Sequence, residues 1–239
     1  LIPSDLGVMD PDEVEFVMQN VYPPVTVVSS ENTHNMSGGT VITREQLRAL
    51  VEVAHTNGAR FHLDGARIFN AATALNLEAS DLAAEVDSVM FCLSKGLSAP
   101  VGSVLVGDAD FIERAHAVRK RLGGAMRQAG VLAAAGIVAL NDLVDRLADD
   151  HKNARRLAEG IVALGVFDVD LETVQSNMFN ADGSAHNLTA EQMVDKLEDV
   201  GIRVNARPPS RVRMVTHRHI SEADIAEALD RRVGIKETL

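Results

Sequence analysis

The chain has little cysteine and no long apolar run, and each shortage argues against a class of protein. Its one cysteine, Cys92, cannot form a disulfide within the chain, and it fits as a small core residue inside an apolar stretch. Chains without disulfides are typical of a reducing compartment, so we expect a cytoplasmic protein. No run of about eighteen apolar residues is present, so we expect neither a membrane-spanning helix nor a membrane partner.

Positive charge is also in short supply. The sequence has 23 Lys and Arg against 34 Asp and Glu, which gives a net charge of −11 at pH 7. Nucleic acids and anionic membranes bind basic protein surfaces, so this balance argues against both as partners. Hydrophobic residues, by contrast, make up 46% of the 239 residues, enough for a sizeable core in one large domain or two smaller ones.

Strand and helix patterns alternate through the first part of the chain. Apolar and β-branched stretches predict strands at 25–29 and 103–106, and two more that end at Asp64 and Leu93. Thr43 and Gln46 form a capping-box pattern at the start of an amphipathic helix that Gly58 ends. We expect further helices at 14–20, 80–85 and 109–122. This alternation predicts an α/β fold in which helices flank a mostly parallel sheet.

The alanine-rich stretch 128–140 is apolar nearly all round. We therefore expect a helix there that is buried against the sheet or against a neighbouring subunit. A charged helix at 142–164 then leads into a second region, with strands predicted at 166–169, 176–180, 202–205 and 211–215 and helices at 190–200 and 221–231. We predict two domains, a large one over 1–141 and a small α+β domain over 142–239.

Two ionisable groups, Asp64 and Lys95, stand at the ends of the two central apolar strands. In an open α/β sheet, ligands bind in the crevice outside the carboxyl ends of the strands, so a carboxylate and an amine there indicate a binding site. Pyridoxal phosphate uses both groups, a lysine for its Schiff base and an acid at its pyridine nitrogen. From the residues alone, two plainer interpretations stay open: Asp64 as a helix N-cap, and Lys95 as a solvated surface lysine.

Four segments carry a family resemblance. They are ENTHN at 31–35, HLDGARIFNA at 62–71, LSKGL at 93–97 and MRQAG at 126–130. In this order and spacing they resemble the pyridoxal-phosphate-dependent threonine aldolases, from about Gly7 to about Glu227. The resemblance implies the fold-type I architecture of these enzymes, pyridoxal 5′-phosphate as cofactor and a small-molecule amino acid as substrate. The early part of the chain is then the C-terminal part of a larger cofactor-binding domain.

The resemblance also implies roles for five residues around the cofactor. Lys95 is the catalytic lysine of the Schiff base, and Asp64 keeps the pyridine nitrogen protonated. Arg67 reaches the phenolate oxygen of the ring. Arg127 and Lys120 approach the phosphate of a cofactor held by a partner subunit, where the planar fork of arginine suits phosphate. The family pattern thus predicts a homo-oligomer, a dimer or tetramer with shared sites.

Two further residues are implied on the substrate side. Arg213 matches the arginine that binds the substrate α-carboxylate, and Arg211 is a close rival because a shift of two residues keeps the same strand face. His34 belongs to the first motif and is a candidate for proton transfer. The family often has a catalytic histidine upstream of that motif, where this chain has Tyr22 as its ionisable residue. The identity of the general base therefore stays open.

The resemblance predicts an aldehyde lyase that cleaves L-threonine or L-allo-threonine to glycine and acetaldehyde by a retro-aldol reaction. The family's first strands, phosphate-binding turn and stacking histidine have no counterpart before Leu1, so we interpret the chain as N-terminally truncated. Ser98 is a departure, since the family usually has glycine there. Two alternatives stay open: another fold-type I enzyme, such as a β-eliminating lyase or a transaminase, and a catalytically incomplete fragment that is a structural or subunit remnant.

Overall fold

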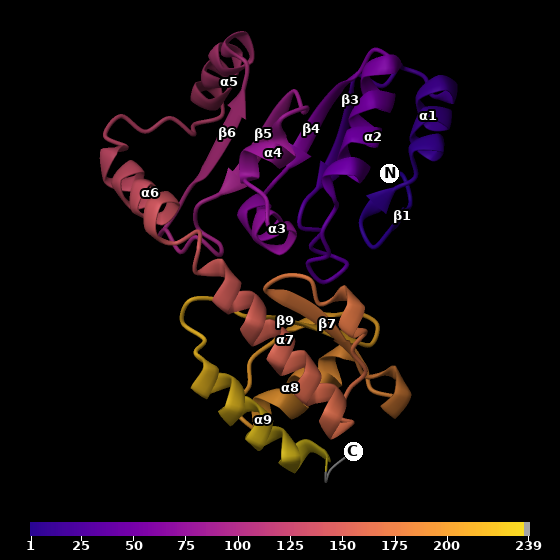
Figure 1. Cartoon of the computed structure of the whole chain (residues 1–239), viewed down its shortest axis with the longest axis vertical. Coiled ribbons are helices and arrows are strands. Elements are labelled where there is room, and N and C mark those ends of the chain that lie inside the picture. The colour runs from indigo at the N-terminus through magenta and orange to yellow at the C-terminus, as the bar shows by residue number, and fades with distance from the viewer. Residues whose placement is uncertain (237–239) are drawn as a thin grey trace. The chain divides into compact units, whose positions relative to one another are not determined.

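The chain divides into two compact units (Figure 1). Unit 1 comprises Leu1–Thr33 and Ile42–Asp145, and unit 2 comprises His34–Val41 and Arg146–Leu239. The structure is a computed structural model that describes residues 1–236 and the side chains of residues 1–231. No helix in this described part is long and apolar enough to cross a membrane.

A four-stranded sheet forms the centre of unit 1. Its order is β3-β4-β5-β6, with β3 at Val27–Glu31, β4 at Arg60–Asp64, β5 at Ser88–Cys92 and β6 at Ser103–Gly107. Strands β3, β4 and β5 are parallel, and β6 is antiparallel to β5. The prediction of a mostly parallel sheet with flanking helices is confirmed. The three parallel strands have their carboxyl ends at one edge of this sheet.

The helices of unit 1 follow the predicted alternation with strands. They are α1 at Pro11–Asn20, α2 at Arg44–Thr56, α3 at Ile68–Leu75, α4 at Ala79–Ala83 and α5 at Ala109–Arg121. The capping box of α2 is present: Thr43 Oγ1 accepts a hydrogen bond from the Gln46 N–H, and Gln46 Oε1 accepts one from the Thr43 N–H. The sequence patterns do not predict α3, which is held by an edge-to-face contact of Phe69 with Phe91.

The short hairpin at the start of unit 1 is likewise absent from the predictions. It pairs β1 at Ser4–Asp5 with β2 at Val8–Met9. Two residues per strand are too few for the alternation of apolar and polar residues that identifies longer strands.

Helix α6, at Gly130–Asp142, exposes most of its apolar surface. Val131, Ile137 and Val138 are 70%, 59% and 53% exposed, and the buried residues of the helix are Gly136 and Ala139. Gly136 lies against Leu93, where an added Cβ would be 3.0 Å from Leu93 Cδ1. The expectation that this helix is buried against the sheet of its own chain is therefore wrong. Burial against a neighbouring subunit stays a prediction.

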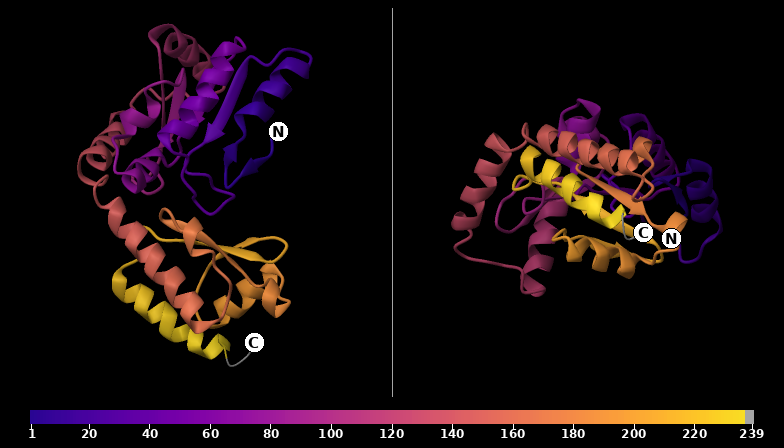
Figure 2. Two further views of the ribbon diagram at one scale, coloured as in Figure 1. Left: turned by 45° about the vertical axis from the view of Figure 1, so that its right-hand side comes forward. Right: turned by 90° about the horizontal axis from the view of Figure 1, so that it is seen from below.

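An antiparallel sheet with helices on one face forms unit 2 (Figure 2). The sheet order is β7-β9-β8, with β7 at Met178–Asp182, β8 at Asn205–Arg207 and β9 at Arg211–Val215. The helices are α7 at Leu147–Leu164, α8 at Ala190–Asp199 and α9 at Glu222–Lys236, with 3₁₀ turns at Leu171–Thr173 and Ser184–His186. In Figure 2, α7 and α9 lie side by side, in agreement with their packing contacts.

Three predicted elements of unit 2 differ from the structure. The strand expected at 202–205 lies further along the chain, as β8 at Asn205–Arg207. The helix expected at 142–164 begins instead at Leu147, because α6 ends at Asp142 and a short connection separates the two helices. The strand expected at 166–169 forms a single bridge, between Asp168 and Asp182. Val166 and Phe167 are buried in the core. The apolar composition of this stretch therefore reflects burial in the core and not a strand.

The two faces of the unit 2 sheet differ in polarity. Phe179 and Ala181 of β7 and Val212 and Met214 of β9 are buried against the helices; the same cluster includes Leu157, Ile161, Met193 and Leu197. Successive side chains of a strand point to opposite faces, so Asn180, Asp182, Arg211 and Arg213 belong to the other face. This second face is called the polar face below.

The Asp87 carboxylate, just before β5, makes the free energy of unfolding of unit 1 depend on pH. Burial opposes its ionisation, but hydrogen bonds from the Phe61 N–H, His55 and Arg60 outweigh burial and lower the pKa of Asp87 to about 2. The charged form therefore stabilises the fold above the unfolded-state pKa of 3.8, and this contribution is lost as the pH falls towards 2. We expect Asp87→Asn to lower the free energy of unfolding at pH 7 by about 2 kcal/mol and to flatten its dependence on pH below 4.

Urea titrations between pH 2 and 7 measure this effect. Asp145→Asn, at an exposed position, is the matched control and should leave the curve unchanged. An Asp87→Asn protein with the acid sensitivity of the wild type would contradict the assignment.

Candidate active site

The carboxylate of Asp64 stands at the carboxyl end of β4. Buried Phe61 and Leu63 alternate with less buried residues along this strand, and Asp64 is its half-buried last residue. Its Oδ1 accepts a hydrogen bond from the Ala66 N–H at 3.0 Å, which closes a tight turn and orients the carboxylate. The N-cap of the following helix is Arg67, so the interpretation of Asp64 as a helix N-cap is wrong.

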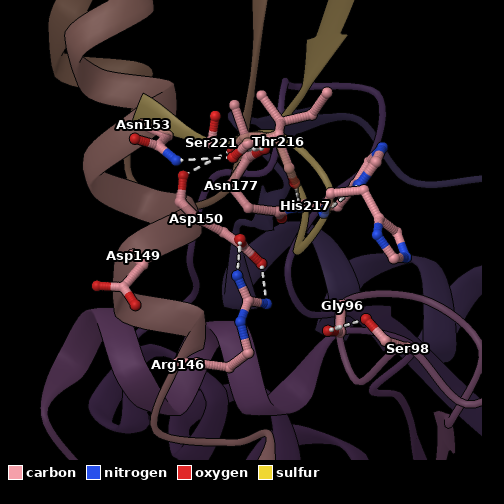
Figure 3. Close-up of polar contacts among 12 residues, drawn as sticks. Gly96, Ser98, Arg146, Asp149, Asp150, Asn153, Asn177, Thr216, His217 and Ser221 are labelled. Carbon is pink, nitrogen blue, oxygen red and sulfur yellow. Dashed lines mark hydrogen bonds and ion pairs between the residues drawn. The ribbon is translucent and has the colours of Figure 1, made fainter. Parts of the chain in front are cut away.

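Lys95 lies in the turn that follows β5. The Ser98 N–H donates to the Lys95 carbonyl at 2.9 Å, and the Ala99 N–H donates to the Leu93 carbonyl at 3.0 Å. Figure 3 shows the third bond of this turn, from Ser98 Oγ to the Gly96 carbonyl at 3.2 Å. The Lys95 side chain is exposed and forms no ion pair with the described residues. A nucleophilic lysine needs such a reachable amine.

The backbone of Ser98 explains why the resemblance places a glycine at this position. Its φ of 60° lies in the left-handed region, which glycine adopts without steric cost. The serine keeps the turn because its own hydroxyl supplies a hydrogen bond to Gly96.

Asp64 and Lys95 follow neighbouring parallel strands of unit 1. The register pairs Asp64 with Met90, so both strands end at the same edge and the Lys95 turn continues from there. Gly65 permits the strand ends to come close, since a Cβ on it would lie 2.9 Å from the Met90 carbonyl oxygen. Arg67 follows at once and is half-buried. This edge therefore carries an acid, an amine and a guanidinium.

Two hydroxyl groups near the end of β3 belong to the same unit. Ser30 Oγ and Thr33 Oγ1 are buried, and neither has a hydrogen-bond partner among the described residues. Buried polar atoms in native proteins are nearly always hydrogen-bonded, so two unsatisfied hydroxyls indicate room for a bound polar group or water.

Lys120 and Arg127 lie further along the chain than Lys95, Lys120 on helix α5 and Arg127 after its end. Lys120 is in the last turn of α5, which packs beside β6, and both side chains are exposed. No contact in the described chain joins them to Asp64 or Lys95. That Lys120 and Arg127 contact the phosphate of a cofactor bound to a partner subunit stays a prediction.

In unit 2, Arg213 occupies the middle of the central strand β9, with Asn180 directly across from it on β7. Its Nη1 donates a hydrogen bond to Oδ1 of Asn35, which is 178 residues away in the sequence. Asn35 follows His34 in the segment His34–Val41, which belongs to unit 2. The structure therefore brings two of the predicted residues, His34 and Arg213, into one unit.

The rival arginine, Arg211, has a different partner. Its Nε donates to Asp182 Oδ2 at 2.9 Å. Burial opposes ionisation of Asp182, but hydrogen bonds from Ser184, Arg211 and Ser210 outweigh it and lower the pKa of this carboxyl to about 2. Arg211 is thus neutralised by a permanent carboxylate, whereas Arg213 donates to a neutral amide.

A buried ion pair fixes the end of the strand that carries Arg213 (Figure 3). The Asp150 carboxylate is fully buried and accepts hydrogen bonds from both Nη atoms of Arg146, at 2.5 and 3.0 Å. Thr216, just after β9, donates its hydroxyl to the Asp150 backbone carbonyl at 2.6 Å. The Asn177 side-chain amide donates to the Thr216 carbonyl at 2.8 Å. These bonds tie β9 to α7 and to the start of β7.

The sequence analysis assigns no role to Asn35 or Asp182, although each contacts one of the two candidate arginines. Asn35 stands inside the first motif, and that position is the signal that points to it. Asp182 carries no such signal, because its contact with Arg211 follows from the register of β7 on β9. Tyr22, which stands near the place of the missing histidine, is 93% exposed and has no environment that prepares it for proton transfer.

The chain is similar in sequence to known proteins. The model of the beta-eliminating lyase family matches residues 1–184. The low-specificity L-threonine aldolase 1 of Arabidopsis thaliana is 42% identical over 225 residues, which are 92% of this chain and 63% of that protein. The low-specificity L-threonine aldolase of Escherichia coli (strain K12) is 40% identical over 217 residues, 91% of this chain and 60% of the relative. The chain spans less than two thirds of the length of these relatives.

Two solved structures have the same fold. The threonine aldolase of Leishmania major gives a TM-score of 0.80 at 18% identity, over 98% of this chain and 69% of that chain. The serine palmitoyltransferase of Sphingomonas wittichii gives 0.72 at 20% identity, over 96% and 59%. At these identities the likeness shows the fold alone. The family match, by contrast, covers most of the sequence, and the chain belongs to the beta-eliminating lyase family.

Proposed function

We propose that this chain carries the core of a pyridoxal 5′-phosphate-dependent aldehyde lyase that cleaves L-threonine or L-allo-threonine to glycine and acetaldehyde. The observation that carries the proposal is the pair of Asp64 and Lys95 at the carboxyl ends of neighbouring parallel strands. The relatives named low-specificity L-threonine aldolases support the substrate class. The single cysteine supports the cytoplasm as the compartment.

The residues at the sheet edge of unit 1 fit pyridoxal phosphate. The Lys95 amine suits its aldehyde, the Asp64 carboxylate its pyridine nitrogen, and the Arg67 guanidinium its phenolate oxygen. The buried hydroxyls of Ser30 and Thr33 leave hydrogen-bonding capacity in the same unit. The chemistry that bound pyridoxal phosphate supplies is that of an electron sink for negative charge at the substrate Cα.

The protein's own groups then divide the remaining tasks. Lys95 would hold the cofactor through its side-chain amine, and the Asp64 carboxylate would lie at the ring nitrogen and keep a proton there. Arg213 binds the substrate α-carboxylate. A base, for which His34 is the candidate, removes the β-hydroxyl proton; the Cα–Cβ bond breaks, acetaldehyde leaves, and a proton returned to Cα gives glycine.

We propose that residues 1–141 are the cofactor-binding domain and residues 142–239 the small domain that supplies Arg213. The exposed apolar side chains of α6 support a homo-oligomer, a dimer or tetramer, because a helix that is apolar on its exposed side is stable when another subunit covers it. In such an assembly, Lys120 and Arg127 would serve the phosphate of a neighbour.

The products of L-threonine test the proposed reaction. With pyridoxal phosphate present, we expect the chain to form glycine and acetaldehyde in equal amounts, and Lys95→Ala to abolish this. Borohydride reduction followed by peptide mapping should place a phosphopyridoxyl group on Lys95. Lys152→Ala, which changes a surface lysine paired with Asp149, is the control and should keep both results.

Other outcomes of this experiment would contradict the proposal. Pyruvate or another keto acid would indicate β-elimination or transamination. A chain with no product and with adducts scattered over several lysines would indicate a catalytically incomplete fragment.

Replacement of the two arginines separates substrate binding from cofactor binding. We expect Arg213→Ala to weaken L-threonine binding about 30-fold or more, because a half-buried charge-assisted contact is lost, and to leave cofactor affinity unchanged. Arg211→Ala, whose charge is already neutralised by Asp182, should have little effect. Calorimetry for the amino acid and cofactor absorbance provide the two readouts. Equal loss of both affinities in Arg213→Ala would refute its assigned role.

A charge on α6 tests the proposed oligomer. Ile137→Asp should weaken self-association at least about tenfold, because the carboxylate would lose its hydration in an apolar interface. Val162→Asp, on the exposed side of α7, is the matched control and should not change assembly. Sedimentation velocity over a range of concentrations measures both. A wild-type monomer, or an Ile137→Asp protein that assembles like the wild type, would refute the interface.

A further inference from the structure

The segment His34–Val41 is bonded to the outer strand of the unit 2 sheet. The Asn180 side-chain amide donates to the Met36 carbonyl at 3.0 Å. Ser176 Oγ donates to the Gly39 carbonyl at 2.6 Å, and Gln175 Oε1 accepts from the Val41 N–H at 2.8 Å. These three bonds come from β7 and the residues just before it, so the segment is attached along its length.

Two glycines make this close attachment possible. Gly38 and Gly39 have φ of +84° and +82°, a conformation that residues with side chains rarely adopt. A Cβ on Gly38 would lie 3.0 Å from the Asn180 backbone nitrogen, and one on Gly39 would lie 2.5 Å from Met178 Cγ. The segment can therefore approach β7 only because these positions lack side chains.

The attached segment delivers Asn35 to Arg213. Asn180, which holds the segment through Met36, is the direct cross-strand neighbour of Arg213. Asn35 Oδ1 accepts the hydrogen bond from Arg213 Nη1. The acceptor is thus held by the same strand that flanks the arginine, which fixes where one hydrogen bond of the guanidinium is received.

We infer that Asn35 is a positioning residue, which turns the guanidinium of Arg213 to receive a carboxylate. The inference rests on the proposed role of Arg213 in binding the substrate α-carboxylate. A guanidinium binds a carboxylate best through two parallel N–H groups, so its plane must face the ligand. Fixing that plane in advance lowers the entropy lost on binding.

The neutrality of Asn35 is part of the inference. An amide oxygen accepts a hydrogen bond from the guanidinium without placing a negative charge beside it. Arg211 on the same strand shows the alternative, because the carboxylate of Asp182 holds it and neutralises it. An aspartate at position 35 would pair Arg213 with a carboxylate, as Asp182 pairs with Arg211.

Arginine side-chain NMR on the full chain, without added cofactor, tests the inference. The ¹⁵Nε and ¹⁵Nη signals of Arg213 report rotation of the guanidinium, and glycine is the carboxylate probe. We expect Asn35→Ala to speed this rotation and to weaken glycine binding about tenfold, the value of one hydrogen bond to a charged group. Asn35→Asp should keep the rotation slow and still weaken glycine binding. Asn205→Ala, at the exposed cross-strand neighbour of Arg213 on β8, is the control and should change neither.

The two readouts separate this inference from the proposed function. Unchanged rotation and glycine affinity in Asn35→Ala would overturn the inference and leave the role of Arg213 intact. Glycine affinity in Asn35→Asp equal to that of the wild type would overturn the argument from neutrality. A wild-type chain whose Arg213 signals do not respond to glycine would overturn the carboxylate role of Arg213 and the inference with it. The Asn35→Asp change preserves size and shape, so its result does not depend on whether Asn35→Ala folds.

Discussion

Parallel pairing of β4 with β5 is the constraint on which the candidate site depends. Parallel strands end at the same edge, and this alone places the turn of Lys95 beside the carboxylate of Asp64. The antiparallel return of β6 holds the other side of the turn, where the Leu93 N–H donates to the Gly102 carbonyl at 2.9 Å. The exposed side chain of Lys95 is therefore carried by a backbone that is bonded on both sides.

The partners of the positively charged side chains distinguish those with a structural role from the candidate functional ones. In a chain with an excess of acidic residues, Arg146 and Arg211 are each held by a carboxylate, the first at the start of α7 and the second across the paired strands β7 and β9. Lys95 forms no ion pair with the described residues, and Arg213 donates to an amide. The two arginines of β9 therefore differ in a partner: the Asp182 carboxylate accepts a hydrogen bond from Arg211, and the Asn35 amide oxygen accepts one from Arg213.

The sequence predicts those features that depend on local patterns. The apolar strands that end at Asp64 and near Leu93 and the capping box at Thr43 all follow from short-range rules, and the structure has them. The antiparallel direction of β6 and the preference for Arg213 depend on strand direction and register, which apolar patterns do not contain. Helix α6 shows the limit most clearly: its composition indicates burial, but composition cannot say whether its own sheet or another subunit provides the cover.

The five-residue motif at 31–35 shows how one short segment contributes to both units. Asn32 is fully buried, and its side chain pairs with the backbone of Ile42 through bonds of 2.9 and 3.2 Å, while its N–H donates to the Asp64 carbonyl. It therefore closes the base of the segment that follows and fixes β3 against the strand of Asp64. Asn35, three residues later, reaches Arg213. The same residue type thus has two separate structural tasks: Asn32 anchors the end of a strand in the sheet of unit 1, and Asn35 contacts an arginine in the sheet of unit 2.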